Sequence, residues 1–288
     1  MDLIFADQKW KMNKNNEVSG AHFDYGNPKD WPKDYPSCGG MRQSPINIQL
    51  QDVGMIEPGQ QPVYRNRYGA KPKRMTITNN GHTVQLTGEW QKGYTPTISG
   101  GPLNGTYQFS ELHFHWGSNN FVGSEHLINN HSFPIEMHIV HWKETYGNKT
   151  EATKHPNGLA VLGYLMSIHK SPNRGLKMMQ MGFQHIVEPS RSTKIDPFPL
   201  SFFDPNVSRQ KTARYFTYPG SLTTPPCSES VTWLLSVRLG NIATHQLDSL
   251  RRLRLSNHDN HNNRPTQQLN GRSVSSYLEI QFSNADSM

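Results

Sequence analysis

The chain has 288 residues, enough for one large domain or two small ones. Hydrophobic residues make up 34 % and charged residues 18 %, with 23 glycines and 20 prolines, which favours many turns between short strands over a helical bundle. The formal charge is +7, but no long run of like charges appears, which argues against a nucleic-acid groove. The scattered charge indicates a solvated surface, with weak attraction to acidic extracellular polymers as the alternative.

No stretch approaches the roughly 20 consecutive apolar residues that span a bilayer, which excludes a transmembrane helix. The opening segment 1–6 is too short for a signal peptide, although a mature secreted form would have lost one. The two cysteines, Cys38 and Cys227, are an even number compatible with one disulfide. Asn-x-Ser/Thr sequons, which suit glycosylated surface loops, occur at Asn104, Asn130, Asn148 and Asn206. Together these features favour a secreted, extracellular protein.

Turn and strand signals follow one another along the chain. Residues 1–20 are polar and irregular and predict a flexible N-terminal arm. From His22 to Gly40, closely spaced prolines and glycines leave room only for turns, so this segment is expected to lie over the surface of the rest. Strand patterns then occur at 75–78, 83–86, 108–116, 135–142, 159–169, 215–218, 231–239 and 277–281.

Helical periodicity is present in two places. Short helices are predicted at 173–183, preceded by Pro172, and at 245–253, with Thr244 as the cap. No internal repeat or low-complexity linker interrupts the chain. One domain around a large sheet is therefore expected over 21–284, followed by a tail at 285–288.

Two of the predicted strands place histidines on common faces. The alternation of a strand points His113 and His115 to the same side, while their apolar neighbours point to the other. In the following strand, His138 lies on one face and His141 on the opposite one. If the two strands are neighbours, His138 closes a triangle with His113 and His115. Three neutral imidazoles and a water make a tetrahedral zinc site with an open position, which is the catalytic pattern.

The alternative is that these histidines are ordinary core residues, since a His-x-His pair is a weak signal in a chain with 14 histidines. Two carboxylates favour the metal site. Glu111 and Glu136 each stand two residues before a candidate ligand, where a carboxylate can orient the ring and fix its tautomer. A structural zinc site would need a fourth protein ligand, and the cysteines occur singly and far from these strands.

The ordered motifs resemble the alpha class of carbonic anhydrases from about His22 to Phe282. The matching segments are Gln43–Ile48, Asn80–His82, His113–Gly117, Ser124–His126, Glu136–Trp142, Gly220–Cys227, Arg264–Pro265 and Leu269–Arg272. The resemblance implies a mostly β (α+β) single domain around a large, mainly antiparallel, twisted central sheet of about ten strands. Short peripheral helices and a conical active-site cleft complete the expected fold. The implied activity is that of a zinc-dependent lyase that reversibly hydrates carbon dioxide to bicarbonate and a proton.

The resemblance assigns the metal-ligand role to His113, His115 and His138. It makes Thr223 the hydroxyl that donates to Glu125 and accepts from zinc hydroxide, because a threonine whose proton is committed to a carboxylate can only accept. The Thr223 backbone N–H is the expected partner of a substrate oxygen, and Thr224 lines the same wall. The metal's expected task is to lower the pKa of bound water to about 7, the magnitude known for carbonic anhydrase itself.

Proton transfer and substrate binding are assigned in the same way. His82 matches the proton-shuttle position, and an imidazole, whose charge changes near neutral pH, can pass a proton to buffer. Without the resemblance, His82 would be interpreted as a turn histidine with no role. The proton path is expected to include Tyr25 and Asn80, and the apolar carbon dioxide pocket is expected to consist of Val140, Val161, Leu222 and Trp233.

Two further features follow from the comparison with the class. Cys38 and Cys227 match the disulfide of its secreted and membrane-anchored members, which would stiffen the segment 222–224 and stabilise the fold by on the order of 5 kcal/mol at most. Glu111 departs from the glutamine usual at its position. A carboxylate there adds negative charge near zinc and should make the bound water less acidic, so a raised pH midpoint of activity is expected.

Competing interpretations remain open at this stage. Non-catalytic relatives that serve as adhesion or matrix-binding modules lose zinc histidines, whereas this chain keeps all three. A second alternative is an esterase or another zinc hydrolase with a different physiological substrate. A mineral-associated role is a further alternative. The segment Asn257–Asn263 is interpreted as a solvated loop rather than a second metal site. Expected partners are carbon dioxide and bicarbonate, with sulfonamides and anions as inhibitors and no nucleic acid. The sequence leaves a monomer or a dimer open.

Overall fold

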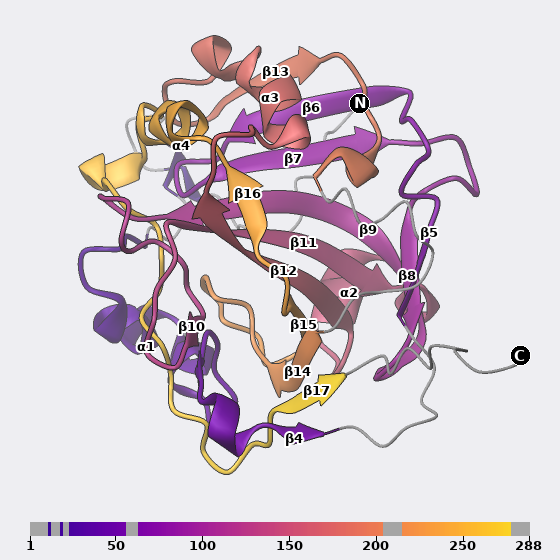
Figure 1. Ribbon diagram of the computed structural model, residues 1–288, viewed down its shortest axis with the longest axis vertical. Coiled ribbons are helices and arrows are strands. Elements are labelled where there is room, and N and C mark those ends of the chain that lie inside the picture. The colour runs from indigo at the N-terminus through magenta and orange to yellow at the C-terminus, as the bar shows by residue number, and fades with distance from the viewer. Residues whose placement is uncertain (1–10, 13–17, 20–22, 56–62, 204–214, 278–288) are drawn as a thin grey trace, which may run out of the picture.

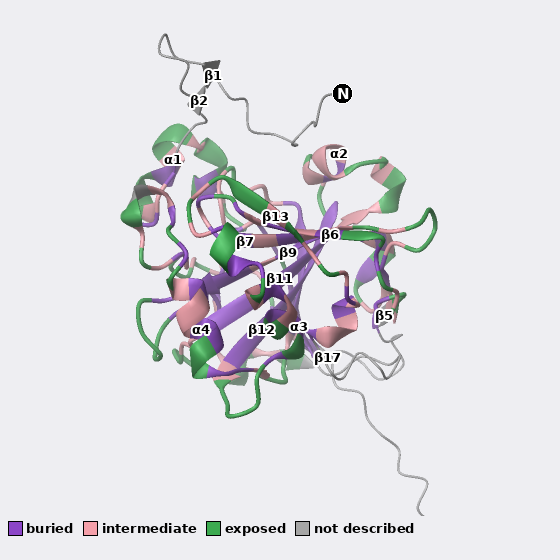
Figure 2. Cartoon of the chain, turned by 90° about the horizontal axis from the view of Figure 1, so that it is seen from above, coloured by how far each residue is buried: buried purple, intermediate pink, exposed green. Residues whose placement is uncertain are grey.

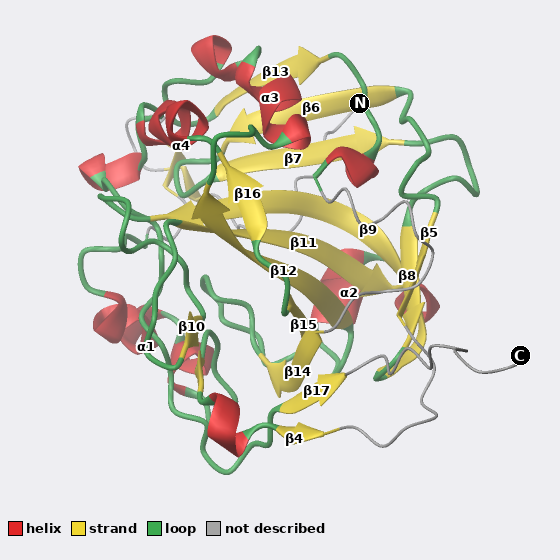
Figure 3. Cartoon of the chain, viewed as in Figure 1, coloured by secondary structure: helices red, strands yellow, loops and turns green. Residues whose placement is uncertain are grey.

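The computed structural model describes residues 11–12, 18–19, 23–55, 63–203 and 215–277. Most strands of the described chain belong to one large sheet (Figures 1 and 3). They are β4 (Gly54–Met55), β5 (Val63–Asn66), β6 (Arg74–Asn79), β7 (Val84–Glu89), β8 (Thr97–Gly100), β9 (Leu103–Trp116), β11 (Ile135–Lys143), β12 (Leu159–Ile168), β13 (Arg191–Ile195), β14 (Tyr215–Gly220), β15 (Val231–Ser236), β16 (Gly240–Ile242) and β17 (Ser275–Tyr277). The main path runs β13-β6-β7-β9-β11-β12-β15-β14-β17-β4, with β5, β8 and β16 attached beside it.

The sheet is mixed, although most of its pairings are antiparallel. β12 runs parallel to β15 and β16, and β17 runs parallel to β4. The predicted large, mainly antiparallel sheet is therefore confirmed, with these parallel pairs as a refinement. A parallel pair needs a crossover connection instead of a tight hairpin, which the turn signals of the sequence do not reveal.

The predicted strand segments agree with the structure over the central strands. Seven of them overlap β6, β7, β9, β11, β12, β14 and β15. The eighth, 277–281, meets β17 only at Tyr277, and its remainder lies outside the described residues. The strands of the sheet that the sequence analysis missed are β4, β5, β8, β13 and β16. β13 is mostly exposed and polar and pairs only at the edge with β6, so it lacks the alternating apolar signal.

Helices are short and peripheral, as expected. They are α1 (Trp31–Asp34), α2 (Lys149–Thr153), α3 (Arg174–Gln180) and α4 (Thr244–Arg251). Asn173 caps α3 by accepting from the Leu176 N–H at 3.0 Å. The prediction that Thr244 caps the second helix was wrong. Ala243 is the N-cap residue, and alanine has no side-chain oxygen that could accept a hydrogen bond. Instead, the Gln246 side chain accepts the backbone N–H of Ala243 at 3.2 Å.

The central strands β11, β12 and β15 are buried on both faces, whereas β6, β7 and β13 toward one edge are partly exposed (Figure 2). One face packs Leu112, Phe114 and Met137 into a core that α3 and α4 cover with their own apolar side chains. The opposite face forms a second cluster around Val140, Val161 and Trp233. The strand alternation predicted for β9 and β11 is confirmed, because Leu112 and Phe114 occupy the first core and leave the intervening histidines on the other face. No described helix is long and apolar enough to cross a membrane.

The N-terminal segment from Phe23 to Gly39 contains only short elements, as predicted: the four-residue α1 and the 3-10 helices Pro28–Asp30 and Pro36–Gly39. Phe23, Tyr25 and Trp31 pack with the two cysteines into a small cluster of their own. Two short pairings lie outside the large sheet: β1 (Lys11–Met12) with β2 (Val18–Ser19), and β3 (Asn47–Ile48) with β10 (Leu127–Ile128). The arm at 1–20, the domain at 21–284 and the tail at 285–288 stay predictions, since most of the arm and all of the tail lie outside the described residues.

Candidate metal centre

The three predicted ligands come from two neighbouring strands. β9 and β11 pair antiparallel, with His113 directly opposite His138 and His115 opposite Glu136. The ring centroids are 4.9 Å apart for His113 and His115, 5.1 Å for His113 and His138, and 4.6 Å for His115 and His138. The sequence predicted the histidine triangle on the condition that these two strands are neighbours, and β9 and β11 are neighbours.

The nitrogens that face one another suit a single cation. Nε2 of His113 and Nδ1 of His138 are 3.3 Å apart, and one candidate ligand atom from each of the three residues lies within 4.8 Å of the others. Nε2 of His115 is buried, with no hydrogen-bond partner in the described part of the chain. Tetrahedral zinc, with zinc–nitrogen bonds of about 2.0–2.1 Å, holds its ligand nitrogens about 3.3 Å apart. The three imidazoles therefore fit zinc.

The outer ring nitrogens are all engaged with oxygens. His113 Nδ1 contacts Glu111 Oε2 at 2.9 Å, His115 Nδ1 contacts the Asn262 carbonyl at 2.7 Å, and His138 Nε2 contacts Glu136 Oε1 at 2.7 Å. Because each outer nitrogen donates, the inner nitrogen of each neutral ring keeps its lone pair for a metal. Both predicted carboxylates therefore lie where they orient ligand rings.

Burial also favours the neutral form of the ligands. Burial, followed by the neighbouring His138 and His113, holds the pKa of His115 well below its ordinary value. Burial lowers the pKa of His138 to about 4, against the opposing effect of Glu136. Since only the neutral imidazole binds a metal, these rings are ready for a cation at neutral pH.

Glu125 lies behind the ligands and is 1 % exposed. Its Oε1 accepts the Arg264 backbone N–H at 2.9 Å, and Oε2 has no hydrogen-bond partner of standard geometry among the described residues. Burial and then Glu136 raise the pKa of Glu125 well above its usual range, while the Thr223 side chain, hydrogen bonding to it, lowers this pKa. A bound cation would also favour the anion. Glu125 and Thr223 are thus neighbours.

The sequence comparisons agree with this geometry. A family model described as eukaryotic-type carbonic anhydrase matches residues 26–278. The chain belongs to the eukaryotic-type carbonic anhydrase family. Among its relatives are carbonic anhydrase 7 of Mus musculus and of Homo sapiens, each 38 % identical over 274 residues, covering 89 % of this chain and 98 % of the relative. Carbonic anhydrases are zinc enzymes that hydrate carbon dioxide, so the enzyme class and zinc predicted from the sequence are confirmed.

A second group of candidate ligands, His126, Glu136 and His138, is a hydrogen-bond network instead of another zinc site of this carbonic anhydrase. Glu136 Oε1 lies 2.7 Å from both His126 Nδ1 and His138 Nε2, and Glu136 Oε2 accepts the N–H groups of Glu125 and His126. Tyr218 continues the network to His126 Nε2 at 2.6 Å. A carboxylate with this many bonds serves to hold His138 in place.

The predicted apolar pocket residues form a row across three strands. Val140 of β11 lies opposite Val161 of β12, which in turn lies opposite Trp233 of β15. All three side chains are almost completely buried, and the half-buried Leu222 packs against the same cluster. Thr224 is half-buried beside the buried Thr223. The row starts two residues beyond His138, so an apolar surface adjoins the ligands.

The predicted proton-path residues occupy the turn between β6 and β7 and the N-terminal segment. His82 is half-buried and stacks on Phe23, with ring centroids 3.8 Å apart. Asn80 Oδ1 accepts the backbone N–H groups of His82 and Thr83 at 3.0 and 2.9 Å, so this side chain also shapes the turn. Tyr25 is buried, and its hydroxyl has no partner among the described residues.

Cys38 and Cys227 form the predicted disulfide, with Cα atoms 4.9 Å apart and a sequence separation of 189. The Cys227 N–H donates to the Thr224 carbonyl at 2.9 Å, which joins the bond to the wall that carries Thr223. Non-reducing mass spectrometry should therefore detect no free thiol. Reduction should release two thiols and lower the free energy of unfolding by at most about 5 kcal/mol. Two free thiols in the untreated protein would contradict this assignment.

The described sequons are exposed, although Asn104 belongs to strand β9 and not to a loop as predicted. Asn104, Asn130 and Asn148 are all exposed, whereas Asn206 lies outside the described residues. Asn148 has a structural role as well, because its side chain caps α2 by accepting from the Glu151 N–H at 2.8 Å. Glycosylation itself stays a prediction, as do secretion and the conical cleft over the histidines.

Sequence reasoning missed the contribution of two residues in the segment after α4. The Asn262 carbonyl holds His115, and its side-chain oxygen accepts the Trp116 N–H at 2.6 Å. The Arg264 guanidinium is buried and donates to the Gln43 side chain and to the carbonyls of Ser44 and Cys38. Arg264 belongs to a motif quoted for the family resemblance, but the pattern of side chains gives no sign that its backbone N–H serves Glu125.

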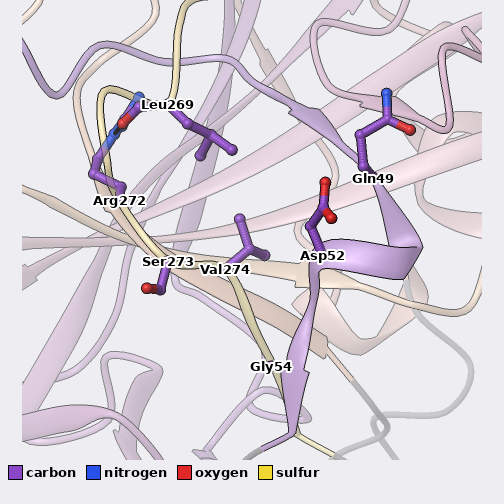
Figure 4. Close-up of a pocket in the computed structure, with 7 residues that line it drawn as sticks. All are labelled: Gln49, Asp52, Gly54, Leu269, Arg272, Ser273 and Val274. Carbon is purple, nitrogen blue, oxygen red and sulfur yellow. Dashed lines mark hydrogen bonds between the residues drawn. The ribbon is translucent and has the colours of Figure 1, made fainter.

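A hollow of about 250 Å³ elsewhere in the molecule does not belong to this site (Figure 4). It is lined by Gln49, Asp52, Gly54, Leu269, Arg272, Ser273 and Val274, none of them a predicted site residue. Arg272 donates to four backbone carbonyls at 2.7 to 3.0 Å, so its charge is committed to holding the chain together.

Proposed function

We propose that this chain catalyses the reversible hydration of carbon dioxide at the triangle of His113, His115 and His138. The convergence of three ring nitrogens, two of them on buried histidines, is the observation that carries the proposal. When bound, zinc acts as a Lewis acid that lowers the pKa of water to about 7, the magnitude known for carbonic anhydrase itself. The protein's part is to hold three neutral rings in fixed tautomers through Glu111, Asn262 and Glu136.

Glu125 and Thr223 orient the nucleophile. A carboxylate accepts only, so an ionised Glu125 takes the Thr223 proton and leaves the hydroxyl oxygen as an acceptor. The attacking oxygen must then donate its hydrogen to Thr223, which turns a lone pair toward the substrate. The Thr223 N–H is the donor for the developing negative charge on a carbon dioxide oxygen.

The apolar row receives the substrate. Carbon dioxide carries no net charge, so the surface made by Val140, Val161 and Trp233 binds it without hydrogen bonds. Leu222 and Thr224 line the same wall. Sulfonamides and small anions are expected to inhibit by competing at the metal.

His82 is the proposed proton shuttle, with Tyr25 and Asn80 beside the water path. Each turnover releases one proton, which must reach buffer before the next begins. His82→Ala should lower kcat by about tenfold or more in dilute buffer while leaving kcat/KM nearly unchanged. Imidazole buffer should restore kcat. Equal kcat values for the variant and the parent in dilute buffer would remove His82 from this role.

Glu111 is proposed to tune the site. Burial is the largest single effect and raises its pKa, but the opposing effects of His113, Lys149 and Gln85 together lower the pKa to about 2. A full negative charge therefore stands where the class usually has glutamine. Glu111→Gln removes this charge, which should move the midpoint of the activity–pH profile to lower pH by about half a unit to one unit. A profile that superimposes on the parent's would contradict the proposal.

A comparison of substrates tests the proposed function against the hydrolase alternative. We expect carbon dioxide hydration to exceed the hydrolysis of an activated ester, such as 4-nitrophenyl acetate, by several orders of magnitude in kcat/KM. An ester rate comparable to the hydration rate would favour a different physiological substrate. The two assays use one preparation, so both rates share the same metal content.

Secretion and glycosylation are proposed on the disulfide and the exposed sequons. Expression in a glycosylating secretory host, followed by enzymatic removal of N-glycans, should produce a stepwise loss of mass. Asn104→Gln and Asn130→Gln should each remove one step. Intracellular retention without any glycan would contradict this part of the proposal.

A further inference from the structure

The segment that follows α4, residues 256–264, is fixed against both the proton-path turn and the metal-binding strand. The Ser256 N–H donates to the Gly81 carbonyl at 2.8 Å, and Asn262 Nδ2 donates to the His82 carbonyl at 2.9 Å. The Asn262 carbonyl holds His115 at 2.7 Å. The Asn/His-rich stretch that the sequence analysis interpreted as a solvated loop is thus a fixed part of the site's border.

This segment carries two imidazoles close to the site, His258 and His261. His258 is exposed, whereas His261 is half-buried, with its ring centroid 6.4 Å from that of Tyr25. Asp259 ties the same place to the N-terminal segment by accepting the Tyr25 N–H at 3.1 Å. Of the two histidines, His261 is therefore the one seated beside a predicted proton-path residue.

Hydrogen bonding fixes which nitrogen of His261 is basic. Its Nδ1 lies 2.9 Å from Asn260 Oδ1, which can only accept, so Nδ1 carries the hydrogen. In the neutral ring this leaves the lone pair on Nε2, which makes no hydrogen bond within the described part of the chain. His261 can thus take up a proton on Nε2 and release it again without breaking its bond to Asn260.

The Tyr25 hydroxyl supplies a second, independent indication. Tyr25 is 2 % exposed, and its hydroxyl has no hydrogen-bond partner among the described residues. Its ring centroid is 5.8 Å from that of Phe23 and 6.4 Å from that of His261, and His82 stacks on Phe23. Each imidazole therefore adjoins one ring of the Phe23–Tyr25 pair, and an ordered water would satisfy the buried Tyr25 hydroxyl.

We propose that His261 is a second proton-relay residue, which works beside His82 and carries protons from the site to buffer through Nε2. The proposal rests on the proposed hydration of carbon dioxide, since that reaction generates the proton. One proton binds Nε2 to give the imidazolium, and the same proton leaves to buffer, so no other bond changes. Tyr25 is the titratable group nearest to His261, and the charged groups that act on Tyr25 are Glu125, Asp259 and Arg264.

The experiment compares His82→Ala, His261→Ala and the double variant in dilute buffer. We expect His261→Ala alone to lower kcat by about twofold, and its addition to His82→Ala to lower kcat by about a further fivefold. The kcat/KM value should stay unchanged throughout, and imidazole buffer should restore kcat in the double variant. If the substitutions instead disturbed the structure of the metal site, kcat/KM would fall and imidazole buffer would not restore kcat. Either result would overturn the proposed relay.

His258→Asn is the matched control, because asparagine tolerates the positive φ of 58° found there. It should leave kcat unchanged in both backgrounds, and the zinc content should be equal in every variant. The nitrogen chemical shifts of the His261 ring should show the Nδ1–H tautomer in the parent, a readout independent of activity. Equal kcat for His82→Ala and the double variant, or an Nε2–H tautomer, would refute the relay. Absence of hydration in the parent would refute the proposed function itself.

Discussion

His115→Ala should abolish stable zinc binding and lower carbon dioxide hydration by at least about a thousandfold. The ring of His115 is fully buried, and it is held by the Asn262 carbonyl at 2.7 Å with Nε2 left unpaired. Alanine removes one of the three convergent nitrogens. The remaining pair, His113 and His138, offers a site with two open positions, from which zinc should be lost to a chelator.

His141→Gln is the matched control for this variant. His141 is also fully buried on β11, but its Nε2 contacts the Tyr68 hydroxyl at 2.6 Å on the opposite side of the sheet. This substitution should lower the free energy of unfolding while leaving one zinc per chain. If His115→Ala retained full zinc and full hydration, the assignment of the ligands would be wrong.

Glu125→Gln should lower kcat/KM for hydration by about a hundredfold with zinc retained. The substitution keeps the size of the side chain but turns an acceptor into a group with an N–H₂ end. The Arg264 N–H already donates to Oε1 at 2.9 Å, so the amide oxygen should stay there and the amide nitrogen should face Thr223. Thr223 would then accept instead of donate, and its hydrogen would point at the nucleophile.

Glu111→Gln provides the comparison for this result, since it makes the same chemical change at another buried carboxylate near a ligand. It should shift the pH profile and leave the maximal rate within about a few fold. A loss of similar size in both variants would show that the orientation of the Thr223 hydroxyl is not what matters. Zinc analysis of both proteins separates lost metal from lost orientation.

The central strands could be predicted from the sequence because their alternation is strong. β9 and β11 bury one apolar set in the main core and turn His113, His115 and His138 to the other face, so both strands and the metal triangle followed from residue spacing. β13 could not be predicted in this way. Its pairing with β6 along an exposed edge depends on backbone hydrogen bonds, which any residue can make.

The same distinction explains the site. Side chains that carry chemistry, such as Glu136 and Thr223, are visible in the sequence as residue types at informative positions. The sequence did not reveal the roles of the Asn262 carbonyl and the Arg264 N–H. These are backbone groups, which every residue other than proline carries, so the residue type does not mark them. Their contribution depends on a loop meeting β9 across a long separation in sequence, which local patterns do not encode.

Removal and return of zinc tests the central claim most directly. Stopped-flow hydration of carbon dioxide should be measured on the purified protein, after a chelator has removed the metal, and again after titration with zinc. Hydration should fall to the uncatalysed rate in the metal-free protein and return in proportion to zinc, with full activity at one zinc per chain. Undiminished hydration by the metal-free protein, or no recovery after one equivalent of zinc is bound, would contradict the account.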